Sequence, residues 1–127
     1  MNKEFIPYNE SLELKELGFD EPCFGYHLCK NSALGVYLEI TTEWIDLLPY
    51  DSSSCKAPTF SQAFRWFREK LAIRSCIIDD HRTPGYTYTT GPDQYYYDTG
   101  SENGWFHTYE EAELACLKKL IEIAKQK

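Results

Sequence analysis

Three residues near the N-terminus are of the types that bind zinc: Cys23, His27 and Cys29. Thiolate sulfur and imidazole nitrogen are usual ligands of that ion, and each must lie within about 2.3 Å of it. On one extended strand the three side chains share a face, but Cys23 and His27 are then about 13 Å apart. No Cys-x-x-Cys pair occurs in the chain. We therefore expect small buried thiols and a strand histidine here, and no metal.

The turn Asp79-Asp80-His81-Arg82 brings acids, a base and a cation together. Hydrolytic metal sites use such groups, but Asp and His are also ordinary turn residues at strand ends. Catalysis further requires an orienting partner and a pocket. The chain has no Gly-rich phosphate loop, no Gly-x-Ser-x-Gly elbow and no His-Glu-x-x-His motif. We expect no catalytic residue and no cofactor, and a chain that is not an enzyme.

Aromatic and basic side chains offer a different chemistry, that of binding. The chain has 10 Tyr, 7 Phe and 3 Trp, which either pack across strands or stack on a ligand at an uncovered sheet face. Residues 56–82 hold six basic side chains against three acidic ones, whereas the whole chain has a formal charge of −7. The candidate interaction surface is formed by Arg65, Trp66, Arg68, Tyr86, Tyr88, Tyr95 and Tyr97.

The elements that must position these residues begin with a short helix. Asn9 is a suitable cap for a helix that runs to about Leu17, and Gly18 followed by Phe19 is typical of a helix end. Residues 22–29 and 34–41 then predict a β-hairpin, because residues 34–41 alternate between apolar and polar. The apolar side chains that we expect on its buried face are Leu34, Val36, Leu38 and Ile40.

Residues 42–48 fit either a continued strand or a helical turn, and the polar residues 49–58, bounded by prolines, predict a loop. Thr59 with Gln62 forms a capping box at the start of a helix. Its buried stripe has helical spacing. The stripe consists of Phe60, Ala63, Phe64, Phe67 and Leu71.

Three short strands follow, at about 73–79, 85–90 and 94–98. A last helix is capped by Thr108 with Glu111 and runs to about Lys125. The order is therefore α-β-β-α-β-β-β-α. Short connections favour antiparallel pairing. The fold class we expect is α+β, an antiparallel sheet of about five strands with helices packed on one face.

Length and composition place the chain among small globular proteins. Its 127 residues suffice for one domain, residues 1–127. We see no signal peptide and no apolar stretch of membrane-spanning length. Five scattered cysteines without an export signal indicate reduced thiols and a cytoplasmic location.

Two helical stretches carry a resemblance to a known family. The stretches PTFSQAFRWFREK (58–70) and TYEEAELACLKKLIEI (108–123) resemble segments of a family of small uncharacterised proteins from Bacteroides-type gut bacteria, their phages and mobile elements. Residues 5–8 and 17–26 also resemble the opening of that family, so about half of the chain is covered. The resemblance implies a phage or mobile-element accessory protein and assigns no activity to any residue.

Our leading interpretation is a binding or adaptor protein that recognises a protein or a small ligand, because Tyr and Trp are favoured at interfaces. One alternative is nucleic-acid binding through residues 56–82, since residues 59–125 have the element order of a double-stranded-RNA-binding domain. Acidic residues at the start of the last helix and the overall negative charge oppose that alternative. A third interpretation is binding of a small ligand or nucleotide at an aromatic cleft.

Overall fold

The computed structural model describes residues 4–29, 35–41, 53–79, 85–92 and 106–126. Contacts within the chain divide it into two compact units, Met1–Phe60 and Ser61–Lys127, and each is described by itself. The single domain expected from the chain length stays a prediction.

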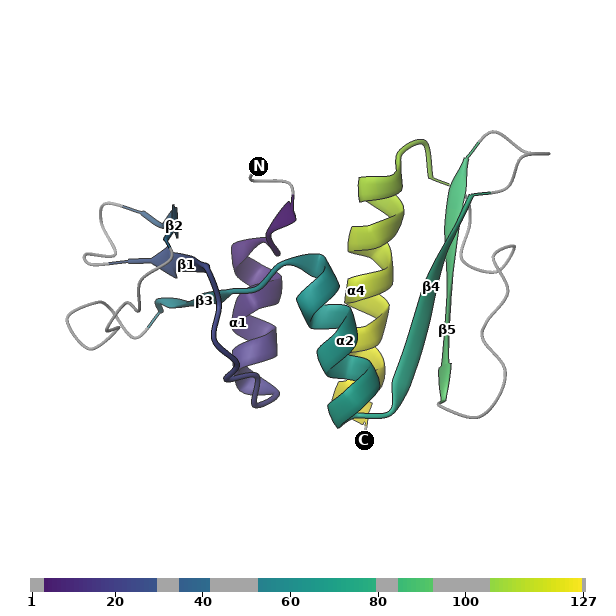
Figure 1. Cartoon of the computed structure of the whole chain (residues 1–127), viewed down its shortest axis with the longest axis horizontal. Coiled ribbons are helices and arrows are strands. Elements are labelled where there is room, and N and C mark those ends of the chain that lie inside the picture. The colour runs from purple at the N-terminus through teal and green to yellow at the C-terminus, as the bar shows by residue number, and fades with distance from the viewer. Residues whose placement is uncertain (1–3, 30–34, 42–52, 80–84, 93–105, 127) are drawn as a thin grey trace. The chain divides into compact units, whose positions relative to one another are not determined.

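The first unit holds one helix and a three-stranded antiparallel sheet. The helix is α1 (Tyr8–Glu16), and the strands are β1 (Gly25–Leu28), β2 (Tyr37–Ile40) and β3 (Cys55–Ala57) (Figure 1). The strand order is β2-β1-β3, so β1 lies in the centre and all four of its residues are buried. The hairpin predicted over residues 22–41 is confirmed, with shorter strands than expected.

Helix α1 begins at Tyr8, one residue before the expected cap. Pro7 occupies the N-cap position, and its carbonyl accepts a hydrogen bond from the N–H of Ser11 at 2.9 Å. Asn9 lies inside the helix and is exposed, so the prediction that it caps the helix is wrong. The φ of Pro7 is −60°, a value that the proline ring enforces, and this directs the chain into the helix.

The end of α1 follows the predicted pattern. Gly18 has a φ of +100°, in the left-handed region that glycine adopts without a steric penalty. The N–H of Phe19 donates to the carbonyl of Leu14 at 3.0 Å, and that of Gly18 donates to the carbonyl of Lys15 at 3.1 Å. These two bonds form a Schellman motif, which turns the chain back so that Phe19 is buried.

Strand β3 corrects the expectation of a loop over residues 49–58. Residues 55–57 pair with β1, with Cys55 opposite His27 and Ala57 opposite Gly25. Cys55 and Ala57 are buried and Lys56 is half-buried. Three residues are too few to give a recognisable alternation, and the prolines and serines around them have the composition of a turn. Residues 49–52 lie outside the described residues.

The close approach of β1 and β3 depends on the absence of a side chain at Gly25. A Cβ atom there would lie 2.7 Å from the backbone oxygen of Ala57 and 2.6 Å from the ring of Phe5. The N-terminal segment continues this packing, because the N–H of Ile6 donates to the carbonyl of Pro58 at 2.9 Å.

Strand β2 is more exposed than its alternating sequence predicts. Val36 and Ile40 are each 39% exposed, and Tyr37 is 52% exposed. The prediction that Val36 and Ile40 lie on a buried face is therefore wrong, while Leu38 is half-buried. Among the described residues β2 has a strand on one side only, and an edge strand is less covered than a central one. Leu34 lies outside the described residues.

The second unit pairs a hairpin with a long helix. It contains nearly all of α2 (Phe60–Lys70), the strands β4 (Ile73–Asp79) and β5 (Tyr86–Pro92), and α4 (Tyr109–Gln126). Helix α4 packs along both strands (Figure 1). The expected helices after Thr59 and Thr108 are confirmed. The N–H of Glu111 donates to the Oγ1 of Thr108 at 3.1 Å, as the predicted cap requires.

The fold class is α+β, as expected, but the strands do not form one sheet of about five. The described strands form two antiparallel sheets, of three and two strands. Both sides of the central strand β1 are taken, one of them by the unforeseen strand β3, and β4 pairs with β5 in a separate sheet. The strand expected at 94–98 lies outside the described residues. No helix in the described part of the chain is long and apolar enough to cross a membrane.

Candidate functional site

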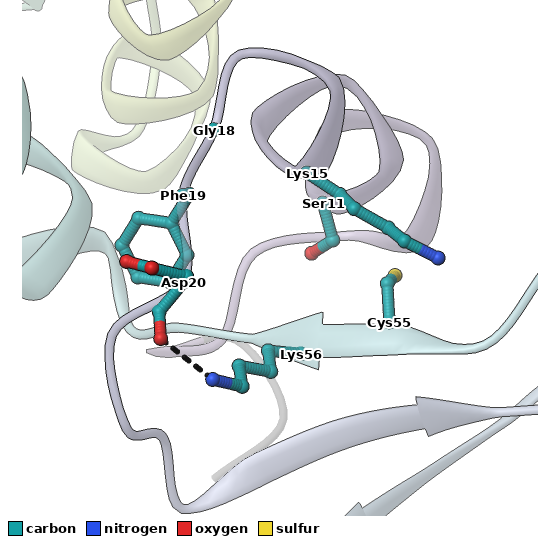
Figure 2. A pocket seen from close by; sticks show the side chains of 7 residues that line it. All are labelled: Ser11, Lys15, Gly18, Phe19, Asp20, Cys55 and Lys56. Atoms are coloured by element: carbon teal, nitrogen blue, oxygen red, sulfur yellow. Dashed lines mark hydrogen bonds between the residues drawn. The ribbon is translucent and has the colours of Figure 1, made fainter. Parts of the chain in front are cut away.

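A pocket of about 330 Å³ opens in the first unit, between α1, the segment that follows it and β3 (Figure 2). We call it the α1–β3 pocket. Its size is at the lower end of the range for small-molecule sites. Its lining residues are Ser11, Lys15, Gly18, Phe19, Asp20, Cys55 and Lys56.

One side of the α1–β3 pocket is formed by the end of α1. Ser11 and Lys15 lie one helical turn apart and therefore on the same face of the helix. The Schellman motif then brings Phe19 and Asp20 back toward β3 (Figure 2). Gly18 adds no side chain, and a Cβ atom there would have no heavy atom within 4 Å, so its position leaves open space at the wall.

The opposite side is β3, which hydrogen bonds hold against α1. The Nζ of Lys15 donates to the backbone oxygen of Ser54 at 3.2 Å. The hydroxyl of Tyr8 donates to the backbone oxygen of Ser53 at 2.9 Å. The N–H of Cys29 donates to the Oγ of Ser54 at 2.7 Å. Residues before β3 are thus bound both to α1 and to the end of β1, which fixes the wall.

A second lysine connects the two sides at the other end of the pocket. The Nζ of Lys56 donates to the backbone oxygen of Asp20 at 2.7 Å (Figure 2). Lys15 is exposed and Lys56 is half-buried. Two ammonium groups therefore border the pocket, one from the helix and one from the strand.

The interior of the pocket is formed by apolar side chains and by a hydroxyl that already has a hydrogen-bond partner within the protein. Phe19 and Cys55 are buried, and the Oγ of buried Ser11 donates to the backbone oxygen of Ile6 at 3.1 Å. Burial raises the pKa of Cys55 to about 11, and the positive charge of Lys15 opposes this only in part. Cys55 is therefore a neutral thiol at pH 7, which behaves as a small apolar side chain and not as a nucleophile.

The charges around the pocket differ from those of the surrounding sequence. The first sixty residues hold four lysines and ten acidic residues. The described lining contains two of these lysines, Lys15 and Lys56, and one acidic residue, Asp20. Cations are thus concentrated at the pocket of an otherwise acidic unit, which favours a negatively charged ligand.

Of the three residues considered as zinc ligands, His27 is bonded to the backbone. His27 is buried, and its Nε2–H donates to the backbone oxygen of Ile6 at 2.8 Å. Desolvation by burial lowers the pKa of His27, against the opposing effect of that bond. Cys23 is half-buried and Cys29 is buried. Among the described residues no group of three or more His, Cys, Asp or Glu could hold a metal ion.

The interaction surface predicted from the sequence lies on the second unit. Arg65 and Arg68 are exposed on α2, whereas Trp66 is 5% and Tyr88 is 7% exposed. Tyr88 stacks on Phe106 with ring centroids 6.4 Å apart. Tyr86 is half-buried. Tyr95 and Tyr97 lie outside the described residues, as do Asp80, His81 and Arg82, so use of this surface stays a prediction.

Arg68 also lines a second hollow, of about 360 Å³, in the second unit. None of its lining residues is buried: Ser61, Arg68, Cys76 and Tyr109 are exposed, and Phe64, Ser75 and Ile77 are half-buried. Burial and nearby acidic groups raise the pKa of Tyr109. A ligand there would remain largely in water, so this hollow fits a binding site less well than the α1–β3 pocket.

Sequence reasoning did not identify the α1–β3 pocket. The helix end at Gly18 and Phe19 was recognisable, and it supplies one wall. The other wall belongs to β3, whose Lys56 lies thirty-six residues after Asp20. Its three residues have no pattern that distinguishes them from a loop. No sequence signal therefore placed Lys56 beside Asp20.

Comparisons with known proteins do not assign the chain to a group. No family model, no curated protein and no solved structure matches it. The resemblance of the two helical stretches to proteins of Bacteroides-type bacteria and their phages therefore stays a prediction.

Proposed function

We propose that the chain is a binding protein without a catalytic role, and that its ligand is a small molecule held in the α1–β3 pocket. The observation that carries the proposal is a hollow with buried Phe19 and Cys55 in its wall and polar groups at its border. Small-molecule sites combine these two features. An accessory role for a phage or mobile element, in the cytoplasm, is part of the same proposal and rests on the resemblance described above.

The chemistry of the pocket supports binding more than catalysis. Its one thiol, Cys55, is neutral at pH 7 because burial raises its pKa. The two lysines donate hydrogen bonds to backbone oxygens, and no histidine lines the pocket among the described residues. General acid–base or nucleophilic catalysis requires an activated group near the operating pH. The proposal therefore assigns these side chains to holding a ligand.

A fragment screen by ligand-observed NMR tests the proposal. Compounds of about ten non-hydrogen atoms are screened against the wild type and Cys55→Leu, which fills the pocket from β3. We expect a set of fragments to bind the wild type and not to bind Cys55→Leu. The control is Cys76→Leu, at an exposed cysteine of the second unit, and it should bind as the wild type does.

A second variant keeps the test valid if Cys55→Leu does not fold. In Gly18→Asn a side chain is added at a residue of the pocket wall where a Cβ atom meets no heavy atom within 4 Å, and Asn tolerates the left-handed φ of this position. Fragments lost in a folded Gly18→Asn protein support the proposal. If no fragment distinguishes the wild type from either folded variant, the pocket is not the binding site.

A second candidate function, binding of a protein partner, is favoured by strand β2. Tyr37, Val36 and Ile40 are exposed, and Phe24, next to β1, is 63% exposed. These apolar side chains lie on and beside β2, which has a strand on one side only among the described residues. Such a strand is typical of surfaces that pair with an extended segment of another protein. We propose such a segment as the partner if the chain is an adaptor.

Photo-crosslinking tests the adaptor function. A photoreactive amino acid replaces Tyr37, and in the control it replaces Tyr109, which is 45% exposed in the second unit. The adaptor function predicts a defined adduct with one protein at position 37 that is absent at position 109. Equal or diffuse labelling at the two positions would contradict it.

A further inference from the structure

We infer that the ligand of the α1–β3 pocket is an amphiphilic anion, an apolar molecule of about ten non-hydrogen atoms that carries one carboxylate or phosphate group. This inference rests on the proposed function and adds the chemical class of the ligand. It follows from three properties of the pocket: its size, its apolar wall and the charges at its border.

The size sets the length of the ligand. A volume of about 330 Å³ holds roughly ten non-hydrogen atoms, if each occupies about the 30 Å³ that a water molecule takes in the liquid. An eight-carbon chain with a terminal carboxylate has this size. A nucleotide is about twice as large, so part of it would extend beyond the pocket.

The wall selects an apolar body. The ring of Phe19, the neutral thiol of Cys55 and the methylene stems of Lys15 and Lys56 surround the space. Ser11 is buried, and its hydroxyl already donates to the backbone oxygen of Ile6. A polar body placed here would lose its bonds to water without equivalent replacements, whereas burial of an apolar body is favourable.

The charged groups select an anionic head. Lys15 approaches from α1 and Lys56 from β3, and each ammonium group donates to a backbone oxygen at the border. Those bonds hold both positive charges in place before a ligand arrives. A carboxylate or phosphate at either end of the pocket would form charge-assisted hydrogen bonds with the ammonium group there, and these are stronger than neutral ones.

Asp20 opposes the binding of an anion, and a substitution at this residue therefore tests the inference. Asp20 lines the pocket, and its carboxylate would repel an anion. Lys56 is bound by the backbone oxygen of Asp20 and not by its carboxylate. Asp20→Asn therefore removes the repulsion and leaves the bond that positions Lys56. The inference predicts that this loss of a native charge strengthens binding.

The experiment measures the affinity of three probes by isothermal titration calorimetry. Octanoate, 1-octanol and octylamine share an eight-carbon chain and differ in the charge of the head. We expect octanoate to bind at least about tenfold more tightly than 1-octanol, the order of one charge-assisted hydrogen bond. Octylamine should bind most weakly. Added salt should lower the affinity for octanoate and leave the affinity for 1-octanol unchanged.

Four variants assign the effect to residues. Lys15→Met and Lys56→Met keep an apolar stem, and the variant that removes the ammonium group at the bound head should reduce the affinity for octanoate by about tenfold. Neither variant should change the affinity for 1-octanol. Asp20→Asn should raise the affinity for octanoate about threefold, which is the usual size of an interaction between solvent-exposed charges. The control Lys118→Met, at an exposed lysine of α4, should leave all three affinities unchanged.

The outcomes separate the class of ligand from the function itself. Equal binding of octanoate and 1-octanol, or tighter binding of octylamine, would overturn the inference and leave the pocket as a binding site. A loss of octanoate binding in Lys118→Met as large as in Lys56→Met would also overturn it. If none of the three probes binds the wild type, both the inference and the proposed pocket fail.

Discussion

The Nζ of Lys56 lies 2.7 Å from the backbone oxygen of Asp20, thirty-six residues earlier in the chain. This bond joins strand β3 to the segment that follows α1, and the two segments border the α1–β3 pocket. The geometry of the pocket therefore depends on how closely β3 approaches the rest of its unit, and Gly25 is the residue that permits this approach.

Gly25→Ala should destabilise the protein by about 2 kcal/mol, within the range for overpacking. The new Cβ would lie 2.7 Å from the backbone oxygen of Ala57, and the backbone of a paired strand has no room to shift. Urea denaturation measures the loss. In the comparison variant, Gly18→Ala, the Cβ meets no atom within 4 Å and φ is +100°, so the loss should be about 1 kcal/mol. An unchanged stability of Gly25→Ala would contradict the described packing of β1 and β3.

The helices of this chain were predictable because their signals are local. The capping pairs at Thr59 and Thr108 and the helix end at Gly18 each lie within a few residues, and the structure has helices at all three places. The bounds of β4 were also predicted, since the turns around it are recognisable. The prediction that Asn9 caps the first helix failed because Pro7, two residues earlier, occupies the N-cap position.

The sheet topology and the pocket depended on information that no local pattern holds. Strand β3 exists because Gly25 allows close pairing and because Ser54 bonds to the end of β1. Neither cause is visible in the sequence of residues 55–57. The single sheet was expected from element order, whereas the described strands form two sheets, with β3 paired to β1 and β4 paired to β5.

Thr90→Val should stabilise the protein. Thr90 is buried on β5, and within the described part of the chain its Oγ1 is a buried side-chain oxygen without a hydrogen-bond partner. An unsatisfied buried hydroxyl costs about 1–3 kcal/mol, and valine has the same shape without that group. Thermal unfolding should show a higher midpoint. Thr87 is equally buried but has an interaction partner, so Thr87→Val should give no gain. A loss of stability in Thr90→Val would mean that its hydroxyl is bonded.

The stability of the protein should fall as pH decreases through His27. Burial lowers the folded-state pKa of His27 below 6.5, so the unfolded state binds the proton more readily. The contribution of neutral His27 is therefore complete above pH 6.5 and decreases as pH falls from there toward the folded-state pKa. His27→Gln keeps a donor for the Ile6 oxygen and does not titrate. Urea denaturation between pH 7.5 and 5 should show a steeper loss in the wild type, and equal slopes would contradict the assignment.

Alkylation should distinguish the cysteines by burial. Cys76 is exposed, whereas burial raises the pKa of Cys55 to about 11 and that of Cys116 to about 12. Because the thiolate is the reactive form, iodoacetamide at pH 8 should label Cys76 first. Peptide mass spectrometry should detect labelled Cys55 and Cys116 only after unfolding. Labelling of Cys55 as fast as that of Cys76 would show that the pocket wall is open to water.

The location of ligand binding tests the central claim most directly. Amide resonances of the isotope-labelled protein are followed by NMR during separate titrations with octanoate and 1-octanol. The account predicts saturable shifts at Gly18, Phe19 and Lys56, with Gly35 and Gly91 unchanged. Shifts that are absent at these three residues, or that centre on β2 or on the second unit, would contradict the assignment of the α1–β3 pocket.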